Sequence, residues 1–156
     1  MLTYLLITFI VLVALAPLSH FRPSKRQRRL ANMREHAALN GMFVEFRQLP
    51  GQPSDRDLRT GDVIYYGKRL PSSVVETHPA ATWICDQGQW RNSDRHGQPP
   101  PEVLKPLGDL ALVAAIAQGS CGIYWVESTQ EEDAQLICQV VQQWSAVLSG
   151  AASAPG

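Results

Sequence analysis

Three cysteines and four histidines are the residues of this 156-residue chain best suited to nucleophilic or metal chemistry. Cys85, Cys121 and Cys138 are widely spaced, without a Cys-x-x-Cys pair and without histidines at the spacing of a zinc site. Cys85 and Cys138 lie in apolar runs. The pattern therefore predicts free, buried thiols that serve packing, and it gives no reason to expect a metal or a cofactor.

The segment Gly119-Ser120-Cys121-Gly122 is the closest approach to a nucleophile loop. It is not a Gly-x-Ser-x-Gly elbow, and no base can be assigned to it, so a turn that enters a strand is favoured. The glycine spacing matches neither a Walker loop nor a dinucleotide-binding loop. We therefore expect no enzymatic activity. The alternative is an enzyme of unknown reaction that acts through Cys121 or through one of the histidines, which otherwise suit solvated or capping roles: His36, His78 and His96.

Four aromatic residues could line a peptide groove, since aromatic side chains are enriched at interfaces. Packing within the core and across neighbouring strands is the favoured interpretation for Trp83, Trp90, Tyr65 and Tyr66.

Charge is distributed unevenly along the chain, although 14 basic and 14 acidic residues cancel. Residues 1–21 carry no Lys, Arg, Asp or Glu, residues 22–34 carry six basic and no acidic residues, and the remainder has a net charge of −6. Because the basic cluster adjoins the apolar N-terminal segment, which would hold it at a membrane, and the rest of the chain is acidic, no nucleic-acid partner is expected.

The apolar run from Leu2 to Phe21 predicts a transmembrane helix over residues 1–21, since about 20 helical residues cover a hydrocarbon core of roughly 30 Å. A cleaved signal peptide is the competing interpretation, but no basic region precedes the run and Pro17 follows the small-x-small pattern Ala14-Leu15-Ala16. Positive charge stays on the cytoplasmic side. The pattern therefore predicts a single-pass bacterial inner-membrane protein with its N-terminus outside and the rest of the chain in the cytoplasm.

Residues 22–40 predict a basic juxtamembrane helix, with Ser24 as N-cap and Asn40-Gly41 as the stop. Its cations either contact anionic lipid headgroups or only set the topology. The residues predicted to contact headgroups are Arg22, Lys25, Arg26, Arg28 and Arg29.

Residues 2–45 resemble the YajC-type accessory subunit of the bacterial preprotein translocase. The resemblance rests on the N-terminal apolar helix, Arg22-Pro23, Lys25-Arg26, a basic helix with Met33, and the run Asn40-Gly41-Met42-Phe43-Val44. It implies an amino terminus outside the membrane and a small β domain entered at Gly41. The rest of the chain, after residue 45, is longer and more helical than the domain of that family.

Residues 41–150 predict a small α+β domain, followed by a disordered tail at 151–156. Alternating and apolar segments bounded by turn residues indicate strands, the Pro-rich segment 92–101 indicates a loop, and a capping box at Ser128 or Thr129 opens a final amphipathic helix. Within 102–117 two short helices are expected, because the alanines of 110–117 favour helix over strand. The expected strands are 42–46, 62–67, 81–85 with its hairpin to 89–91, and 121–127.

An anchor, a basic neck and the lack of a catalytic constellation together predict a protein-interaction module. Its partner is an unidentified membrane or cytoplasmic protein, with the domain as an accessory to a membrane complex such as the preprotein translocase.

Overall fold

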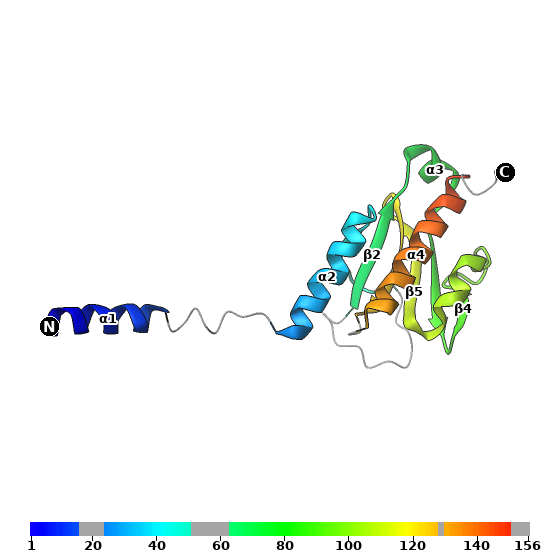
Figure 1. Cartoon of the computed structure of the whole chain (residues 1–156). Helices are drawn as coiled ribbons and strands as arrows, with labels where there is room; N and C mark the ends of the chain where they lie inside the picture. The colour runs from blue at the N-terminus through cyan, green and yellow to red at the C-terminus, as the bar shows by residue number, and fades with distance from the viewer. Residues whose placement is uncertain (16–23, 51–62, 128–129, 151–156) are drawn as a thin grey trace.

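The computed structural model describes residues 1–15, 24–50, 63–127 and 130–150 (Figure 1). The segments 51–62 and 151–156, the proposed capping residues Ser128 and Thr129, and Arg22 lie outside these ranges. The helices are α1 (Leu2–Leu15), α2 (Lys25–Leu39), α3 (Ser72–Thr77), the 3₁₀ helix η2 (Glu102–Leu110) and α4 (Glu131–Leu148).

The described strands form one antiparallel sheet with the order β1-β2-β6-β5-β3-β4. Three hairpin-like pairs build it, and the short strands β1 and β4 form its two edges. The tight β3–β4 turn places Gln87 and Gly88 at positive φ, as the predicted hairpin requires. The strands are β1 (Phe43–Glu45), β2 (Val63–Arg69), β3 (Ala81–Asp86), β4 (Gln89–Asn92), β5 (Ala111–Ala117) and β6 (Ser120–Val126).

Helices α2 and α4 lie over one face of the sheet (Figure 1). Alternate strand residues supply the two faces, since successive side chains of a strand point to opposite sides. The face beneath the helices includes Tyr66, Ile123 and Trp125. The opposite face has its own buried cluster, which includes Tyr65 and Tyr124. The α+β class is therefore confirmed.

The prediction of a helix at 110–117 is wrong, because Ala111–Ala117 is the central strand β5. It pairs with β3 on one side and β6 on the other, and six of its seven residues are buried. A strand buried on both faces is a continuous apolar run, which periodicity cannot distinguish from a buried helix. Alanine suits this strand because large side chains on the neighbouring strand occupy the space beside it: Ala114 lies opposite Trp83.

The prediction of a transmembrane helix over residues 1–21 is contradicted. Helix α1 has 14 residues, about 21 Å at roughly 1.5 Å per residue, against a hydrocarbon core of about 30 Å. None of the helices in the described part of the chain has the length and apolar content needed to cross a membrane. This finding overturns the single-pass inner-membrane location and the orientation derived from it.

Candidate functional site: a pocket between two helices

Helix α2 is part of the folded domain, which corrects its prediction as a juxtamembrane neck. It begins after Ser24, whose hydroxyl accepts a hydrogen bond from the backbone N–H of Gln27. The side-chain oxygen of Gln27 in turn accepts a hydrogen bond from the backbone N–H of Ser24. The apolar stripe of this basic helix faces the sheet, where Met33 and Ala37 are buried in the core. Although most residues of α2 are polar, the helix therefore has a narrow apolar face that packs on the sheet.

An ion pair holds the middle of α2 against the end of β6. Arg34 binds Glu127 through Nη2 at 2.5 Å and through Nε at 3.0 and 3.2 Å, and the Tyr66 hydroxyl donates to the same carboxylate at 2.8 Å. The Glu127 side chain is only 7% exposed. The hydrogen bond from Arg34 to Glu127 raises the pKa of the guanidinium. Burial, followed by the hydrogen bond to Glu127, raises the pKa of Tyr66.

A second polar contact joins the end of α2 to α4. The Gln142 side-chain amide donates to Asn40 Oδ1 at 3.0 Å. Since residues near the start of α4 lie beside the middle of α2, the two helices run in the same direction across the sheet (Figure 1). The hydrogen bond between Gln142 and Asn40 holds the two helices together directly. The ion pair between Arg34 and Glu127 acts indirectly, because it holds α2 on the sheet that α4 also covers.

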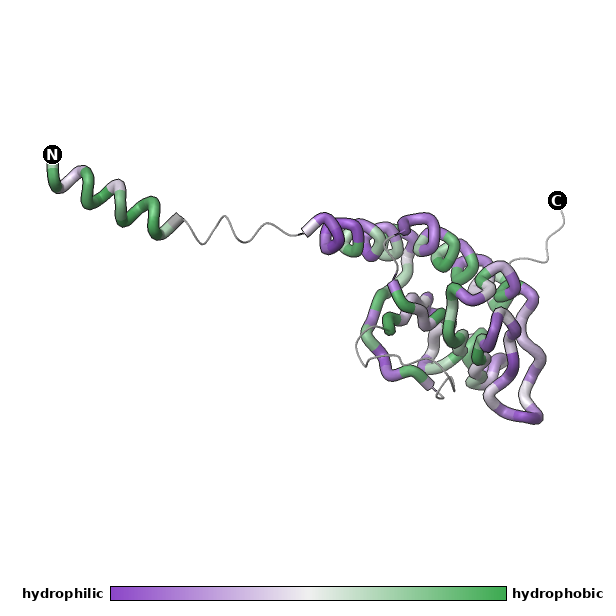
Figure 2. Tube along the Cα trace, turned by 90° about the horizontal axis from the view of Figure 1, so that it is seen from below, coloured by the Kyte–Doolittle hydropathy of each residue, from purple (hydrophilic) through white to green (hydrophobic). Residues whose placement is uncertain are grey.

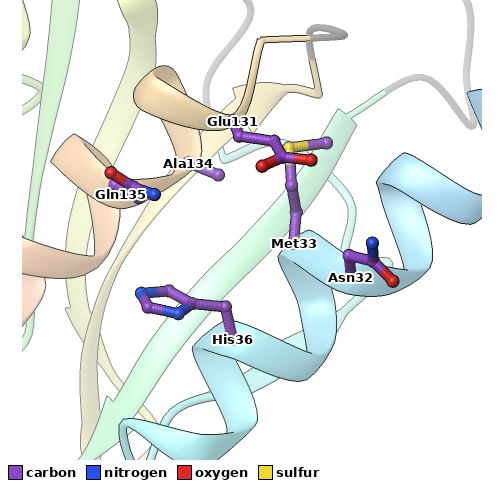
Figure 3. Close-up of a pocket in the computed structure, with 6 residues that line it drawn as sticks. All are labelled: Asn32, Met33, His36, Glu131, Ala134 and Gln135. Carbon is purple, nitrogen blue, oxygen red and sulfur yellow. The ribbon is translucent and has the colours of Figure 1, made fainter.

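A pocket of about 170 Å³ opens in this seam, between the middle of α2 and the first turns of α4 (Figure 3). Its floor is apolar, because Met33 and Ala134 are each buried. Its rim is polar and exposed, with an i, i+4 pair from each helix. These rim residues are Asn32 and His36 from α2, and Glu131 and Gln135 from α4.

The four rim side chains surround the mouth of the pocket. In Figure 3 the His36 ring points from α2 toward α4, and the Glu131 carboxylate is seen at the end of the Met33 side chain. None of the four rim side chains forms a hydrogen bond or ion pair with another described residue. Glu131 carries the single formal charge of the lining. The pocket thus offers one carboxylate, two amides and an imidazole around an apolar floor.

The three cysteines are buried free thiols, as the sequence predicts. Cys121 is 0% exposed, and burial raises its pKa to about 12. Burial also raises the pKa of Cys138 to about 11, and Cys85 donates to the Gly108 carbonyl at 3.0 Å. A raised pKa removes the thiolate that nucleophilic chemistry needs, and in the fold the three thiols are parts of the core.

The histidines named from the sequence do not come together. His78 is the C-cap residue of α3, with Nδ1 3.1 Å from the Val74 carbonyl oxygen. His96 lies exposed in the loop after β4, and its backbone amide donates to Asp94. His36 alone belongs to the pocket. Within the described residues, no group of three or more His, Cys, Asp and Glu side chains is arranged to hold a metal.

The cations predicted to contact lipid headgroups lie on the first turns of α2, except for Arg22, which is outside the described residues. All four are exposed: Lys25, Arg26, Arg28 and Arg29. Their contact with headgroups stays a prediction.

The aromatic residues considered for a peptide groove belong to the core instead. Trp83 is buried and donates to the Gln98 carbonyl at 3.1 Å, while Trp90 donates to Leu104 O at 3.1 Å. Tyr65 and Tyr66 are 0% exposed on opposite faces of the sheet. They pack the sheet from both sides.

No family model, curated protein or solved structure matches the chain. The resemblance of residues 2–45 to the YajC-type subunit gains no support from these comparisons. The chemistry of the pocket must therefore be derived from its own residues.

Of the four polar rim residues, the sequence singles out only His36 as a candidate functional residue. The other three are Asn32, Glu131 and Gln135. The available signal was the matching i, i+4 spacing of Asn32 with His36 and of Glu131 with Gln135. This spacing indicates a shared site only once α2 and α4 are known to be neighbours.

Proposed function

We propose that this chain is a non-enzymatic protein-interaction module, in which α1 docks into an apolar groove formed by helices of a partner protein. One observation carries the proposal. The large apolar side chains of α1 from Leu2 to Val13 are 49% to 82% exposed. Figure 2 shows α1 hydrophobic along its length, and Figure 1 shows it standing apart from the sheet and its helices.

Exposed apolar surface on this scale favours burial by another molecule. Fully burying one Leu, Ile or Phe side chain contributes about 1.5–3 kcal/mol, and monomeric proteins rarely expose large contiguous apolar patches. The sheet and its helices form their own core without any residue of α1. An occupant from outside the described domain is therefore favoured.

The shape of α1 favours a protein as that occupant. At about 21 Å the described helix is shorter than a hydrocarbon core of roughly 30 Å. It also lacks the polar face of a helix that lies flat on a membrane surface. A groove between apolar helices can enclose such a segment on more than one side.

Photo-crosslinking from α1 tests the proposal and identifies the partner. A photoreactive amino acid replaces Leu6 in the full chain, and the same probe replaces Lys105, which is exposed on η2. The proposal expects the Leu6 probe alone to crosslink to apolar helical segments of one recurring protein. Crosslinks only to lipid, or only to a second copy of this chain, would contradict it.

Binding to the purified partner then tests the enclosure of α1. Helix residues advance by about 100° each, so Leu5 with Phe9 and Ile7 with Val11 lie on opposite faces. Each pair is changed to glutamine, and both double variants are expected to lose at least about 100-fold in affinity. The control is Val147→Gln, an exposed apolar position on α4, which is expected to bind normally. Unchanged affinity in both double variants would rule out docking through α1.

A further inference from the structure

We propose that the pocket between α2 and α4 binds a basic side chain, a lysine or an arginine, presented by a partner protein. The pocket is remote from α1 in the fold, and the inference does not depend on what α1 binds. It rests on the size of the pocket, the arrangement of apolar and polar groups within it, and the sign of its charge.

The size of the pocket suits one long side chain. Pockets for drug-sized ligands measure roughly 300–1,000 Å³, whereas this one measures about 170 Å³. Lysine and arginine carry an aliphatic stem below a charged head, so they can bury the stem against apolar surface while the head stays at the rim. The buried side chains of Met33 and Ala134 provide that apolar surface.

The rim supplies acceptors for the charged head. Ionised carboxylates accept hydrogen bonds only, and the amide oxygens of Asn32 and Gln135 accept as well. Hydrogen bonds from a cation to a carboxylate are shorter and stronger than those between neutral groups. Because Glu131 has no ion-pair partner among the described residues, a bound lysine or arginine would provide one.

The charge around the pocket favours a cation over an anion. Glu131 is followed on α4 by Glu132 and Asp133, and no lysine or arginine is among the residues that line the pocket. The nearest exposed cations on α2, Arg28 and Arg29, precede the pocket residues by about one turn. Side chains of helical residues lean toward the helix N-terminus, and neither arginine is among the residues that line the pocket.

The methionine methyl groups of the full chain provide a direct test. The protein is labelled with ¹³C at the methionine methyls, and n-butylguanidinium or n-butylammonium is added at constant ionic strength. Met33 on the pocket floor is expected to shift with a dissociation constant on the order of 10 mM. Met42 is buried outside the pocket and Met1 is fully exposed, so both are expected to stay unchanged. Butyrate, which has the opposite charge, is expected to leave Met33 unchanged too.

A matched pair of variants tests the carboxylate. Glu131→Gln is expected to weaken binding about threefold, whereas Glu132→Gln removes the same charge from the same helical turn without touching the pocket and is expected to bind normally. Equal effects of the two substitutions would overturn the proposal. So would a silent Met33 methyl, or a shift with butyrate equal to that with n-butylguanidinium. The two probe outcomes use the unaltered chain, so they remain decisive if a variant fails to fold.

Discussion

Gly67 and Gly122 lie directly opposite each other in the neighbouring strands β2 and β6, and the ring of Tyr65 lies across both. The Tyr65 hydroxyl is 3.1 Å from Ser120 Oγ, and Ser120 in turn donates to the Ala117 carbonyl at 3.0 Å. The glycines leave room for the ring, and the ring covers backbone that glycine leaves without side chains. Removing a Cβ from both strands thus lets an aromatic ring lie flat along the sheet.

Alanine at either glycine is expected to destabilise the domain by about 1–3 kcal/mol, the usual effect of overpacking a core. A Cβ at Gly67 would meet ring atoms of Tyr65 and Phe43. A Cβ at Gly122 would meet the Tyr65 ring and also the backbone oxygen of Tyr66. Denaturant unfolding measures both effects.

A double-mutant cycle with Tyr65→Leu separates the two causes. Removing the ring is expected to relieve most of the effect of Gly67→Ala, because only side chains obstruct that position. It is expected to relieve less of the effect of Gly122→Ala, because the Tyr66 oxygen cannot move independently of the strand. Equal relief at both positions would show that the backbone contact does not matter.

The ion pair between Arg34 and Glu127 is expected to hold α2 on the domain. Arg34→Met keeps the aliphatic stem but leaves a nearly buried carboxylate with Tyr66 as its remaining described partner. We expect a loss of about 1–3 kcal/mol in the free energy of unfolding. Arg28→Met is the control, since Arg28 is exposed on the same helix, and it is expected to change stability by less than about 0.5 kcal/mol. A neutral Arg34→Met variant would contradict the assigned role.

Stability is expected to fall as the pH rises from about 9 to 12. Burial raises the pKa of Cys138 from 9.0 to about 11, that of Cys121 from 9.0 to about 12, and that of Tyr65 from 10.0 to about 12. Over this range the unfolded chain has lost protons that the folded chain retains, so the unfolded state binds fewer protons and is favoured. Denaturant midpoints measured at intervals of pH test this. A flat profile between pH 9 and 12 would contradict it.

The thiols are expected to be inert in the folded protein. A thiol reagent at neutral pH should label Cys85, Cys121 and Cys138 only as fast as the domain opens, and should label all three at once in denaturant. Mass spectrometry of the labelled peptides identifies each site. Rapid labelling of Cys121 in the native protein would contradict its burial and would restore the hypothesis of a thiol enzyme.

Local patterns in the sequence were sufficient for several elements. The capping residue Ser24, the hairpin turn at Gln87-Gly88 and the amphipathic stripe of α4 each depend on residues close together in the chain. The stripe residues Ile137, Val141 and Trp144 are all buried. Two other predictions failed. Ala111–Ala117 has the composition of a helix but forms a strand between two other strands. The apolar run that begins at Leu2 was expected to form a transmembrane helix, but the described helix extends only from Leu2 to Leu15.

The sequence alone was enough to establish the α+β class, the buried free thiols and the basic helix after Ser24, because periodicity, capping and apolar context are encoded in neighbouring residues. The tertiary structure alone revealed that the basic helix packs on the sheet, that Arg34 meets Glu127, and that Asn32 and His36 share a pocket with Glu131 and Gln135. These residues lie about a hundred positions apart in the chain. Their proximity follows from the packing of α2 and α4 on one face of the sheet, which no local pattern specifies.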